Sequence, residues 1–433
     1  MALIDSKRQR ALVLSALFCA QGIPRGFMIV AMISYLTERG ISDAQAGRLS
    51  AIILLPWALR IVWAPLLDAI VFRSMGRRRP WIIGAELMMA VSLLGLLTIS
   101  DATRSLTLLS CLFFLHNCFA ALQDVATEAL AIDILPANEL GTMNGFMIGA
   151  KVMGRGLGAA GLASIMKYSG LRAAIIVQFV VLVGIMLFPL LTLERPGEKR
   201  FPWSRGQAAV GGPRIEVLSL FAVLKDLYRA FWLRTTASLF LFGVAASIGE
   251  EIVDLITKPF YTKALGWTFV QYSSVAGLAV LFSISGSLAG GWAADRIGQR
   301  TTMTLGIGGY GLLAITFGTF TALWTQSWPV IGFLVLGPAA SAFGGVAFFA
   351  MAMRVAWTRS AVSVFTTLIT VAAFGHVIGD SLIGPLREGL GLSYGAMFVT
   401  GGVLMILPLP LLFAVTPEQV DKKKQAEKVA ALA

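Results

Sequence analysis

Charged residues are scarce in this chain. Only 13% of its 433 residues are Asp, Glu, Lys or Arg, whereas soluble proteins carry roughly 25%. So few charges cannot cover the surface of a water-soluble globule of this size. Hydrophobic residues make up 57% of the chain, and its mean hydropathy is +0.79. The composition therefore excludes a soluble globular protein and predicts one that has lipid as its main solvent.

Histidine and cysteine are also rare. The chain has 2 His and 3 Cys, and they lie in apolar runs, without a metal-binding spacing or a disulfide framework. His116 and His376 belong to no nucleophile–histidine–acid set. The sequence also lacks the G-x-x-x-x-G-K loop that binds nucleoside triphosphates. We therefore expect no enzyme activity, no cofactor, no metal site and no ATP hydrolysis by this chain.

The formal net charge of +12 could indicate a nucleic-acid-binding protein. The basic residues, however, form short clusters between apolar runs. Topology rules for membrane proteins place Lys and Arg in such loops. We therefore expect the lipid bilayer as a partner and no nucleic acid.

Long apolar runs are what this chain has in abundance. A bilayer-spanning helix needs roughly 20 mostly apolar residues, with its backbone hydrogen bonds satisfied internally. The runs are continuous rather than alternating, which excludes a transmembrane barrel. The sequence predicts an all-α polytopic membrane protein with twelve transmembrane helices in two six-helix halves. The predicted spans are residues 11–36, 44–67, 80–100, 106–132, 143–168, 173–193, 231–257, 268–293, 301–323, 328–353, 361–386 and 393–415.

A polar stretch rich in Pro, Gly, Lys and Arg separates six predicted spans from six. Lys and Arg concentrate on the segments that face the cytoplasm if the N-terminus does, so both termini are expected there. We expect a multi-pass protein of the bacterial inner membrane. Its predicted parts are an N-terminal six-helix bundle (1–193), a cytoplasmic linker (194–230), a C-terminal six-helix bundle (231–416) and a cytoplasmic tail (417–433).

One motif occurs in each predicted half. Asp68 is followed by Gly76 and three arginines, and Asp295 is followed by Arg296, Gly298 and Arg300. Duplication across two halves is typical of transporters. The second copy resembles the signature loop of the major facilitator superfamily. This resemblance implies the major facilitator fold, in which the aspartates and arginines lock neighbouring helices at the cytoplasmic face. The conformational gate that it implies comprises Asp68, Arg77, Arg78, Asp295, Arg296 and Arg300.

Further residues narrow the resemblance. They are Pro65-Leu-Leu-Asp68, Gly76-Arg-Arg-Arg-Pro-Trp81, Arg60, Gln123-Asp124 with Glu128, Asp133-Ile-Leu-Pro136 and Gly249-Glu250. This set is similar to the AmpG-type muropeptide permeases and the related acetyl-CoA transporters. The sequence departs from the muropeptide permeases at His376, where an arginine is expected. The resemblance implies proton-coupled import of a muropeptide-like solute, an anhydro-sugar peptide, by alternating access.

Ionisable residues also lie deep inside predicted spans. Each costs about 2.5–3.5 kcal/mol at bilayer depth, so it needs a partner or a wet cavity. Several occur in pairs four residues apart, which share one helix face. The alternative interpretation is a set of internal salt bridges that hold the bundle together. The predicted proton-coupling and substrate residues are Arg25, Gln123, Asp124, Glu128, Lys151, Arg155, Glu250, Asp254, His376 and Asp380.

The expected partners are therefore a small-molecule substrate, protons and the bilayer, and we expect a monomer. Two alternatives fit the same residues. The chain could be a permease for a siderophore or another polar or anionic metabolite, or it could be an exporter with the same fold.

Overall fold

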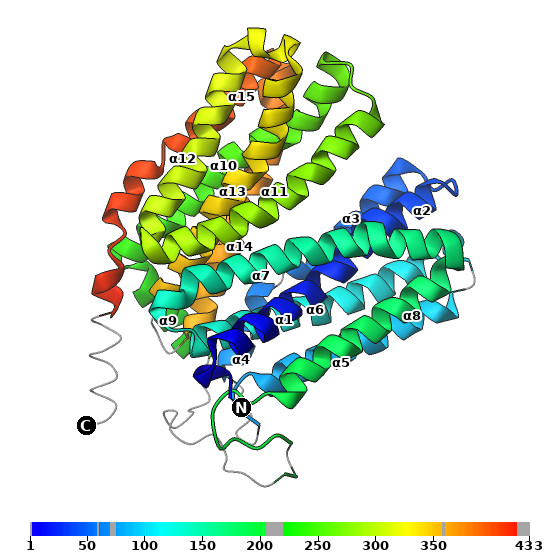
Figure 1. The fold of residues 1–433 in the computed structure, drawn as a ribbon, viewed down its shortest axis with the longest axis vertical. Coiled ribbons are helices and arrows are strands. Elements are labelled where there is room, and N and C mark those ends of the chain that lie inside the picture. The colour runs from blue at the N-terminus through cyan, green and yellow to red at the C-terminus, as the bar shows by residue number, and fades with distance from the viewer. Residues whose placement is uncertain are drawn as a thin grey trace. The chain divides into compact units, whose positions relative to one another are not determined.

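The computed structural model describes residues 2–58, 60–69, 75–99, 101–201, 203–204, 220–356 and 360–421, and all structural statements below concern these residues. Their secondary structure is helical, with no β-strand in the described ranges (Figure 1). One isolated bridge pairs Ala2 with Leu193. The predicted all-α fold class is therefore confirmed.

The chain forms two compact units. Unit 1 comprises Met1–Leu135, Ala150–Val223 and Ser360–Thr366, and unit 2 comprises Pro136–Gly149, Leu224–Arg359 and Thr367–Ala433. Consequently, helix α7 (Leu140–Gly156) begins in unit 2 and continues in unit 1, whereas α14 (Ala361–Gly384) begins in unit 1 and continues in unit 2.

The helices of the first half of the chain are long and mostly continuous. A π-helical turn at Phe27–Met32 joins α1 to α2, and residue 59, between α3 and α4, lies outside the described ranges. The helices are α1 (Lys7–Gly26), α2 (Ile33–Thr37), α3 (Asp43–Ala58), α4 (Arg60–Ala69), α5 (Arg79–Leu94), α6 (Leu106–Ile134), α7 (Leu140–Gly156) and α8 (Leu162–Leu191).

The second half begins with a short helix, α9, whose apolar and polar residues lie on opposite faces. The helices that follow it are again long. The bounds are α9 (Leu220–Phe231), α10 (Arg234–Pro259), α11 (Phe269–Arg296), α12 (Gln299–Thr319), α13 (Ser327–Val355), α14 (Ala361–Gly384) and α15 (Tyr394–Ile406).

Four π-helical turns continue four of these helices. They follow α1 at Phe27–Met32, α7 at Leu157–Gly161, α10 at Phe260–Ala264 and α14 at Pro385–Gly389. These helices correspond to predicted spans one, five, seven and eleven, so each turn in the first half has a counterpart in the second. Turns of this kind are often found at functional sites. The repeat seen in the sequence motifs therefore extends to the backbone.

Nine described segments are long and apolar enough to cross a membrane. One of them, Ala137–Leu191, is 55 residues long. The backbone of Gly170 within it has a φ of 85°, which breaks the helix between predicted spans five and six. Predicted spans seven and nine exist as helices α10 and α12 but are not among the nine. The count of twelve spans stays a prediction.

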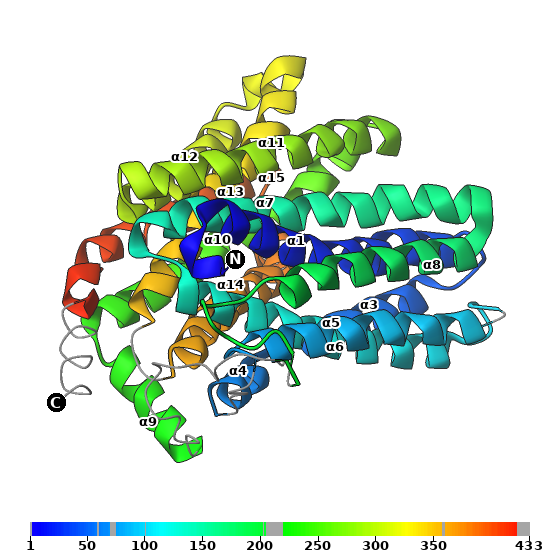
Figure 2. The same cartoon turned by 60° about the horizontal axis from the view of Figure 1, so that its bottom comes forward.

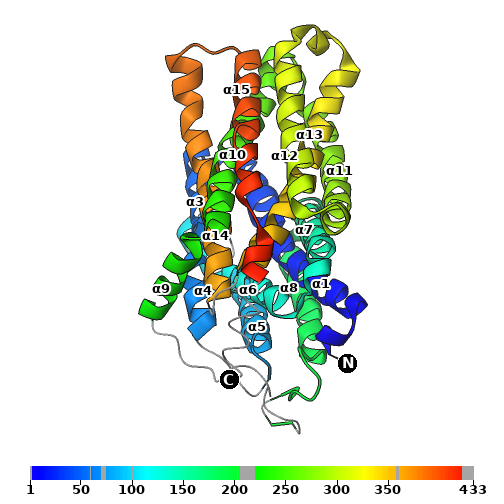
Figure 3. The same ribbon diagram turned by 90° about the vertical axis from the view of Figure 1, so that its left-hand side faces the viewer.

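Tight helix packing forms the interior of each unit. In unit 1, α5 packs against α6 and α8, as Figure 2 shows. In unit 2, α12 packs against α13 and α15, and α10 also packs against α15 (Figure 3). The approach of α12 to α13 requires glycine, because a Cβ atom on Gly306 would lie 2.4 Å from the backbone nitrogen of Gly344. Small residues at helix contacts are typical of membrane bundles.

Candidate functional site

Arg60 is the centre of a buried charge cluster in unit 1. Its guanidinium lies 3.1 Å from the carboxylate of Asp124 and donates a short hydrogen bond to Glu128. The two acids are one helical turn apart on α6, which brings both to the same face. Both are buried. The acidic face predicted from their spacing therefore exists, and Arg60 on α4 is its partner.

Lys151 on α7 completes the cluster. Its Nζ atom donates a hydrogen bond of 3.0 Å to Asp124. It also lies 5.1 Å from the centre of the Trp57 ring and 5.2 Å from that of Phe18, within the range of cation–π attraction. Asp124 thus has two cations, Arg60 and Lys151. A proton arriving at Asp124 would compete with both of them.

Two further arginines of unit 1 have no carboxylate in contact among the described residues. Arg25 lies 5.4 Å above the Trp57 ring, which a hydrogen bond from its indole nitrogen to Asn117 holds in place. The side chain of Arg155 is exposed. These two guanidinium groups are therefore available to an anion.

Glycines set the position of the two arginines. A Cβ atom on Gly22 of α1 would lie 2.2 Å from the carbonyl oxygen of Lys151, and one on Gly26 would lie 2.0 Å from that of Arg155. Side chains larger than hydrogen would separate α1 from α7. The helix contact therefore brings Arg25, between the two glycines, next to the turn that carries Lys151 and Arg155.

Three acids of unit 2 lie together on α10. Glu250 accepts a short hydrogen bond from the hydroxyl of Ser341 on α13. Asp254 accepts one of 2.7 Å from the hydroxyl of Tyr310 on α12. Neither acid forms an ion pair within the described ranges. The face predicted from their four-residue spacing thus holds two carboxylates with neutral partners.

His376 pairs with the third of these acids. Its Nδ1 atom lies 2.7 Å from the carboxylate of Glu251. The sequence grouped His376 with Asp380, four residues further along α14. The Asp380 side chain is exposed and has no ion pair in the described part of the chain. Helix spacing therefore placed these residues on one face, but tertiary packing supplied a different partner.

Gln123, the last residue of the predicted cavity set, is fully buried. Its side-chain amide bonds to Gln21 on α1 and to Glu86 on α5. It belongs to a polar network beside the charge cluster, and Glu86 was not among the predicted site residues.

Asp68 of the first motif copy is bound on two sides in unit 1. One carboxylate oxygen lies 3.3 Å from Arg78 and 3.9 Å from Arg77, and Arg78 also pairs with Asp133 at 2.8 Å. The other oxygen accepts hydrogen bonds from the backbone N–H (3.1 Å) and hydroxyl (3.0 Å) of Ser363. Ser363 lies in the first turn of α14, where free N–H groups and the helix dipole favour a carboxylate.

Asp295 of the second copy binds a helix N-terminus in the same way in unit 2. It accepts hydrogen bonds of 2.7 Å from the backbone N–H groups of Gly141 and Thr142, and one of 2.5 Å from the Thr142 hydroxyl. Both residues lie in the first turn of α7. The two motif copies therefore each place an aspartate on the first turn of the helix that begins predicted span five or eleven.

The arginines of the second copy differ from the expectation. Arg296 lies over the Trp292 ring at 5.6 Å, and Arg300 donates a short hydrogen bond to the carbonyl oxygen of Val415. No ion pair joins either of them to Asp295 within the described ranges. Backbone N–H groups of α7 donate the hydrogen bonds to Asp295 that the arginines were expected to donate.

Two residues that were not predicted anchor the first motif copy. Glu194 accepts hydrogen bonds from the backbone N–H groups of Arg77 (2.9 Å), Arg78 (2.7 Å) and Arg79 (2.6 Å). Burial raises the pKa of the Glu194 carboxyl above its ordinary value, although these hydrogen bonds oppose the shift. The buried Arg79 side chain donates to the carbonyl oxygens of Met75, Pro189, Leu190, Lys199 and Arg200.

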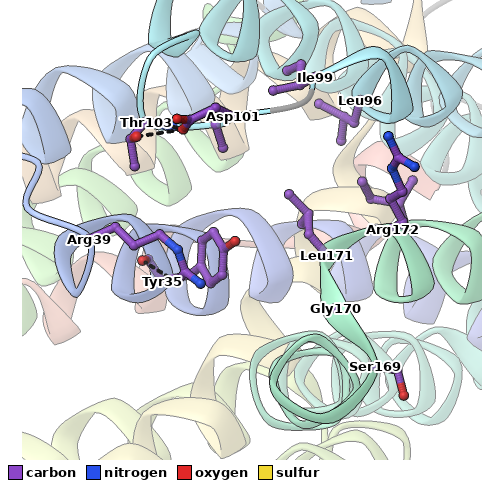
Figure 4. A pocket seen from close by; sticks show the side chains of 12 residues that line it. Tyr35, Arg39, Leu96, Ile99, Asp101, Thr103, Ser169, Gly170, Leu171 and Arg172 are labelled. Carbon is purple, nitrogen blue, oxygen red and sulfur yellow. Dashed lines mark hydrogen bonds between the residues drawn. The ribbon is translucent and has the colours of Figure 1, made fainter.

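A cavity of about 590 Å³ lies elsewhere in unit 1, among the loops that join its helices (Figure 4). Arg39 covers the Tyr35 ring at 3.6 Å on one side. Asp101 accepts hydrogen bonds from the backbone and hydroxyl of Thr103. None of the predicted site residues lines this cavity, so it is separate from the charge cluster.

No group of three or more metal-ligating side chains occurs in the described residues. Site residues that sequence reasoning missed include Tyr310, Ser341 and Glu86. A tyrosine or serine in an apolar helix does not by itself indicate a functional site in a single sequence. Glu86 did carry one, because it is an acid inside an apolar run.

Comparison with known proteins identifies the family. The Major Facilitator Superfamily family model matches residues 14–380. The chain is 24% identical to the anhydromuropeptide permease of Escherichia coli K12 over 420 residues, covering 93% of this chain and 80% of the permease.

Solved structures share the fold. The human organic anion transporter MFSD10 superposes with a TM-score of 0.66 at 15% identity, covering 94% of this chain and all of that one. The E. coli fucose:proton symporter FucP gives a TM-score of 0.65 at 12% identity, covering 94% and 98%. The match to the family model extends over most of the sequence. The chain therefore belongs to the Major Facilitator Superfamily and is a multi-pass membrane transporter of small molecules, not an enzyme.

Proposed function

We propose that this transporter imports a muropeptide-like solute, an anhydro-sugar peptide, in symport with protons. The observation that carries the proposal is the buried cluster in which Asp124 contacts both Arg60 and Lys151, at 3.1 and 3.0 Å. A carboxylate held by two cations inside a membrane protein is well suited to exchange a proton for an ionic contact. Intramembrane acids of this kind mark proton pathways in transporters.

The substrate class rests on two further observations. The relative from E. coli that aligns over 93% of this chain is named anhydromuropeptide permease. In addition, Arg25 and Arg155 have no carboxylate in contact among the described residues. A peptide attached to a sugar carries carboxylates, and guanidinium groups bind carboxylates with paired hydrogen bonds. We assign these two arginines to the anionic part of the substrate.

Proton coupling follows from competition at Asp124. Burial disfavours its charged form and the two cations favour it. Entry of water and substrate on one side of the membrane changes that balance, so the acid can take up a proton on one side and release it on the other. Glu250 and Asp254 in unit 2, with hydroxyl partners only, form the second proton-responsive group in this proposal.

Asp68 and Asp295 serve as the conformational gate. Each holds the first turn of a helix, α14 or α7, that belongs partly to one unit and partly to the other. Breaking these hydrogen bonds would free the helix starts during alternating access. Arg77 and Arg78 hold Asp68 in this scheme, whereas backbone N–H groups hold Asp295.

The remaining proposals concern organisation. We place the protein in the bacterial inner membrane as a monomer, with both termini and residues 194–230 on the cytoplasmic side. Residues 1–193 and 231–416 form the two six-helix bundles of this proposal, and 417–433 form a cytoplasmic tail. Residues 202 and 205–219 of the linker and residues 422–433 of the tail lie outside the described ranges.

A permease for a siderophore or another anionic metabolite is the second candidate. His376 favours it, because it replaces the arginine expected in muropeptide permeases and pairs with Glu251 instead of remaining a permanent cation. An exporter of the same fold would use the same residues with the opposite net direction.

Reconstituted protein tests the proposal directly. Proteoliposomes are given an inward proton gradient and labelled anhydromuropeptide, with a labelled siderophore in parallel. We expect accumulation of the muropeptide that collapses when a protonophore removes the gradient. Accumulation of the siderophore alone would replace the first candidate by the second. Accumulation of neither, or gradient-independent uptake, would contradict proton-coupled import.

A further inference from the structure

Glu86 is a buried acid that the proposed mechanism does not use. It lies seven residues after the start of α5, about 10 Å along the helix. Its side chain is fully buried. One carboxyl oxygen accepts a hydrogen bond of 2.9 Å from the side-chain amide of Gln123. The other oxygen is buried and has no hydrogen-bond partner among the described residues.

No cation compensates this acid. Asp124 and Glu128, one helical turn apart on the neighbouring helix α6, both contact Arg60. Glu86, in contrast, has no ion pair in the described ranges. The helices packed against α5 are α6 and α8. The ionisable residues of α8 are Lys167, Tyr168 and Arg172, and residues 173–191 contain none.

Several ionisable groups of the surrounding helices have other partners. On α6, His116 bonds to Ser92 and to the carbonyl oxygen of Met89, and Asp133 pairs with Arg78. On α1, which contributes Gln21 to the network, Arg10 bonds to two carbonyl oxygens and Arg25 lies over Trp57. Cys19, also on α1, is a neutral thiol under ordinary conditions.

An ionised carboxylate in this position would be costly. A buried charge needs a counter-charge or several hydrogen bonds, and a buried acid without them takes up a proton instead. Glu86 has one hydrogen bond and no counter-charge. We propose that Glu86 is a proton-binding site of its own, distinct from the Arg60–Asp124 cluster, and that it holds its proton at neutral pH.

The hydrogen bonds of the Gln123 and Gln21 side-chain amides depend on whether Glu86 carries its proton. Gln123 donates to Glu86 and, at 3.3 Å, to the carbonyl oxygen of Leu17, and it accepts a hydrogen bond of 2.7 Å from Gln21. This arrangement suits a carboxylate. When Glu86 carries a proton, the Gln123 amide turns over, so that its oxygen accepts from the Glu86 hydroxyl. The Gln21 amide turns as well, so that its oxygen, which has no partner in the arrangement seen here, accepts from the Gln123 nitrogen, and the bond to Leu17 is given up.

The hydrogen-bonded chain formed by Glu86, Gln123 and Gln21 lies next to the charge cluster. Gln123 immediately precedes Asp124, so a turn of its amide changes the hydrogen bonding one residue from the acid that Arg60 and Lys151 hold. The proton comes from water and returns to water, and no other bond is made or broken. The inference adds a second proton site to the proposed symport, but its test requires no substrate.

Infrared difference spectroscopy of the purified protein in lipid provides the test. A protonated carboxylic acid has a C=O stretching band that a carboxylate or an amide lacks. We expect this band in the wild-type protein at pH 7 and in the difference spectrum between the wild type and Glu86→Gln, a variant that keeps the shape of the side chain. The matched control, Glu128→Gln on α6, should retain the band.

A second variant tests the hydrogen bond between Glu86 and Gln123. Gln123→Met removes the partner of Glu86 and leaves the acid in place, so the band should remain but shift. The absence of a C=O band from the difference spectrum between the wild type and Glu86→Gln, or an equal band in the one between the wild type and Glu128→Gln, overturns the inference. So does an unshifted band in Gln123→Met. Because no substrate is present, failure of muropeptide transport would not affect this result.

Discussion

Asp295 binds the first turn of α7 through Thr142, whose backbone N–H and hydroxyl both donate to one carboxylate oxygen. Asp68 binds the first turn of α14 through the same two groups of Ser363. Each contact combines hydrogen bonds with the favourable field of a helix N-terminus. Such a field contributes typically 0.3–1 kcal/mol, and up to about 2 kcal/mol when partly buried.

The gate prediction follows from these contacts. Asp295→Asn removes the charge that the α7 N-terminus favours, and we expect transport to fall several-fold while folding is retained. Arg296→Gln should have a smaller effect, since Arg296 lies over Trp292 and does not contact Asp295. Initial uptake rates in proteoliposomes, normalised to reconstituted protein, measure both. Equal losses in the two variants would favour an Asp–Arg relay over helix capping.

Arg60 should be essential for stability. Arg60→Met leaves the buried Asp124 and Glu128 with Lys151 alone, and breaking a buried ion pair costs about 3–5 kcal/mol. Arg155→Met should cost little, because the Arg155 side chain is exposed and has no described ion pair. Thermal unfolding in detergent compares the two variants. A wild-type melting temperature for Arg60→Met would show that the cluster does not stabilise unit 1.

Arg25 and Arg155 should act on substrate binding. Arg25→Gln and Arg155→Gln remove cations that we assign to the substrate anion, and we expect KM to rise at least about tenfold, since hydrogen bonds to charged groups contribute about 1.5–3 kcal/mol. Arg172→Gln, in the separate cavity of Figure 4, serves as the control. Unchanged KM in both test variants would remove the arginines from the substrate site.

The linker prediction can be tested by labelling. A cysteine placed at Gln207, in a segment outside the described residues, should react with a membrane-impermeant reagent only after the cytoplasmic side is opened. The three native cysteines are first replaced by serine or alanine. Labelling of intact spheroplasts from the periplasmic side would reverse the proposed topology.

The fold was readable from the sequence because its signals are local. Long apolar runs predict helices one at a time, and the repeated Asp–Gly–Arg motif indicated the family that the comparison confirmed. The four-residue spacing also placed Asp124 and Glu128 on one face of α6. None of these inferences requires knowledge of which helices are neighbours.

Partners could not be predicted in the same way, because they come from distant parts of the chain. Arg60 and Glu128 are 68 positions apart, His376 and Glu251 are 125 apart, and Thr142 and Asp295 are 153 apart. A single sequence does not tell which of several cations reaches a given acid. The pairing of His376 with Glu251, and the helix N-terminus bound by Asp295, therefore emerge only from the packed structure.

Proton-driven uptake by Asp124→Asn and Glu250→Gln tests the central claim most directly. Each substitution removes a titratable carboxyl group and keeps the shape of the side chain. Counterflow exchange, which requires binding and alternating access but no proton gradient, serves as the check on folding, and Asp101→Asn is the control for a loop acid. The account predicts that both variants retain counterflow but lose accumulation driven by an inward proton gradient. If both still concentrate the substrate as the wild type does, Asp124 and Glu250 are structural residues and the coupling mechanism proposed here is wrong.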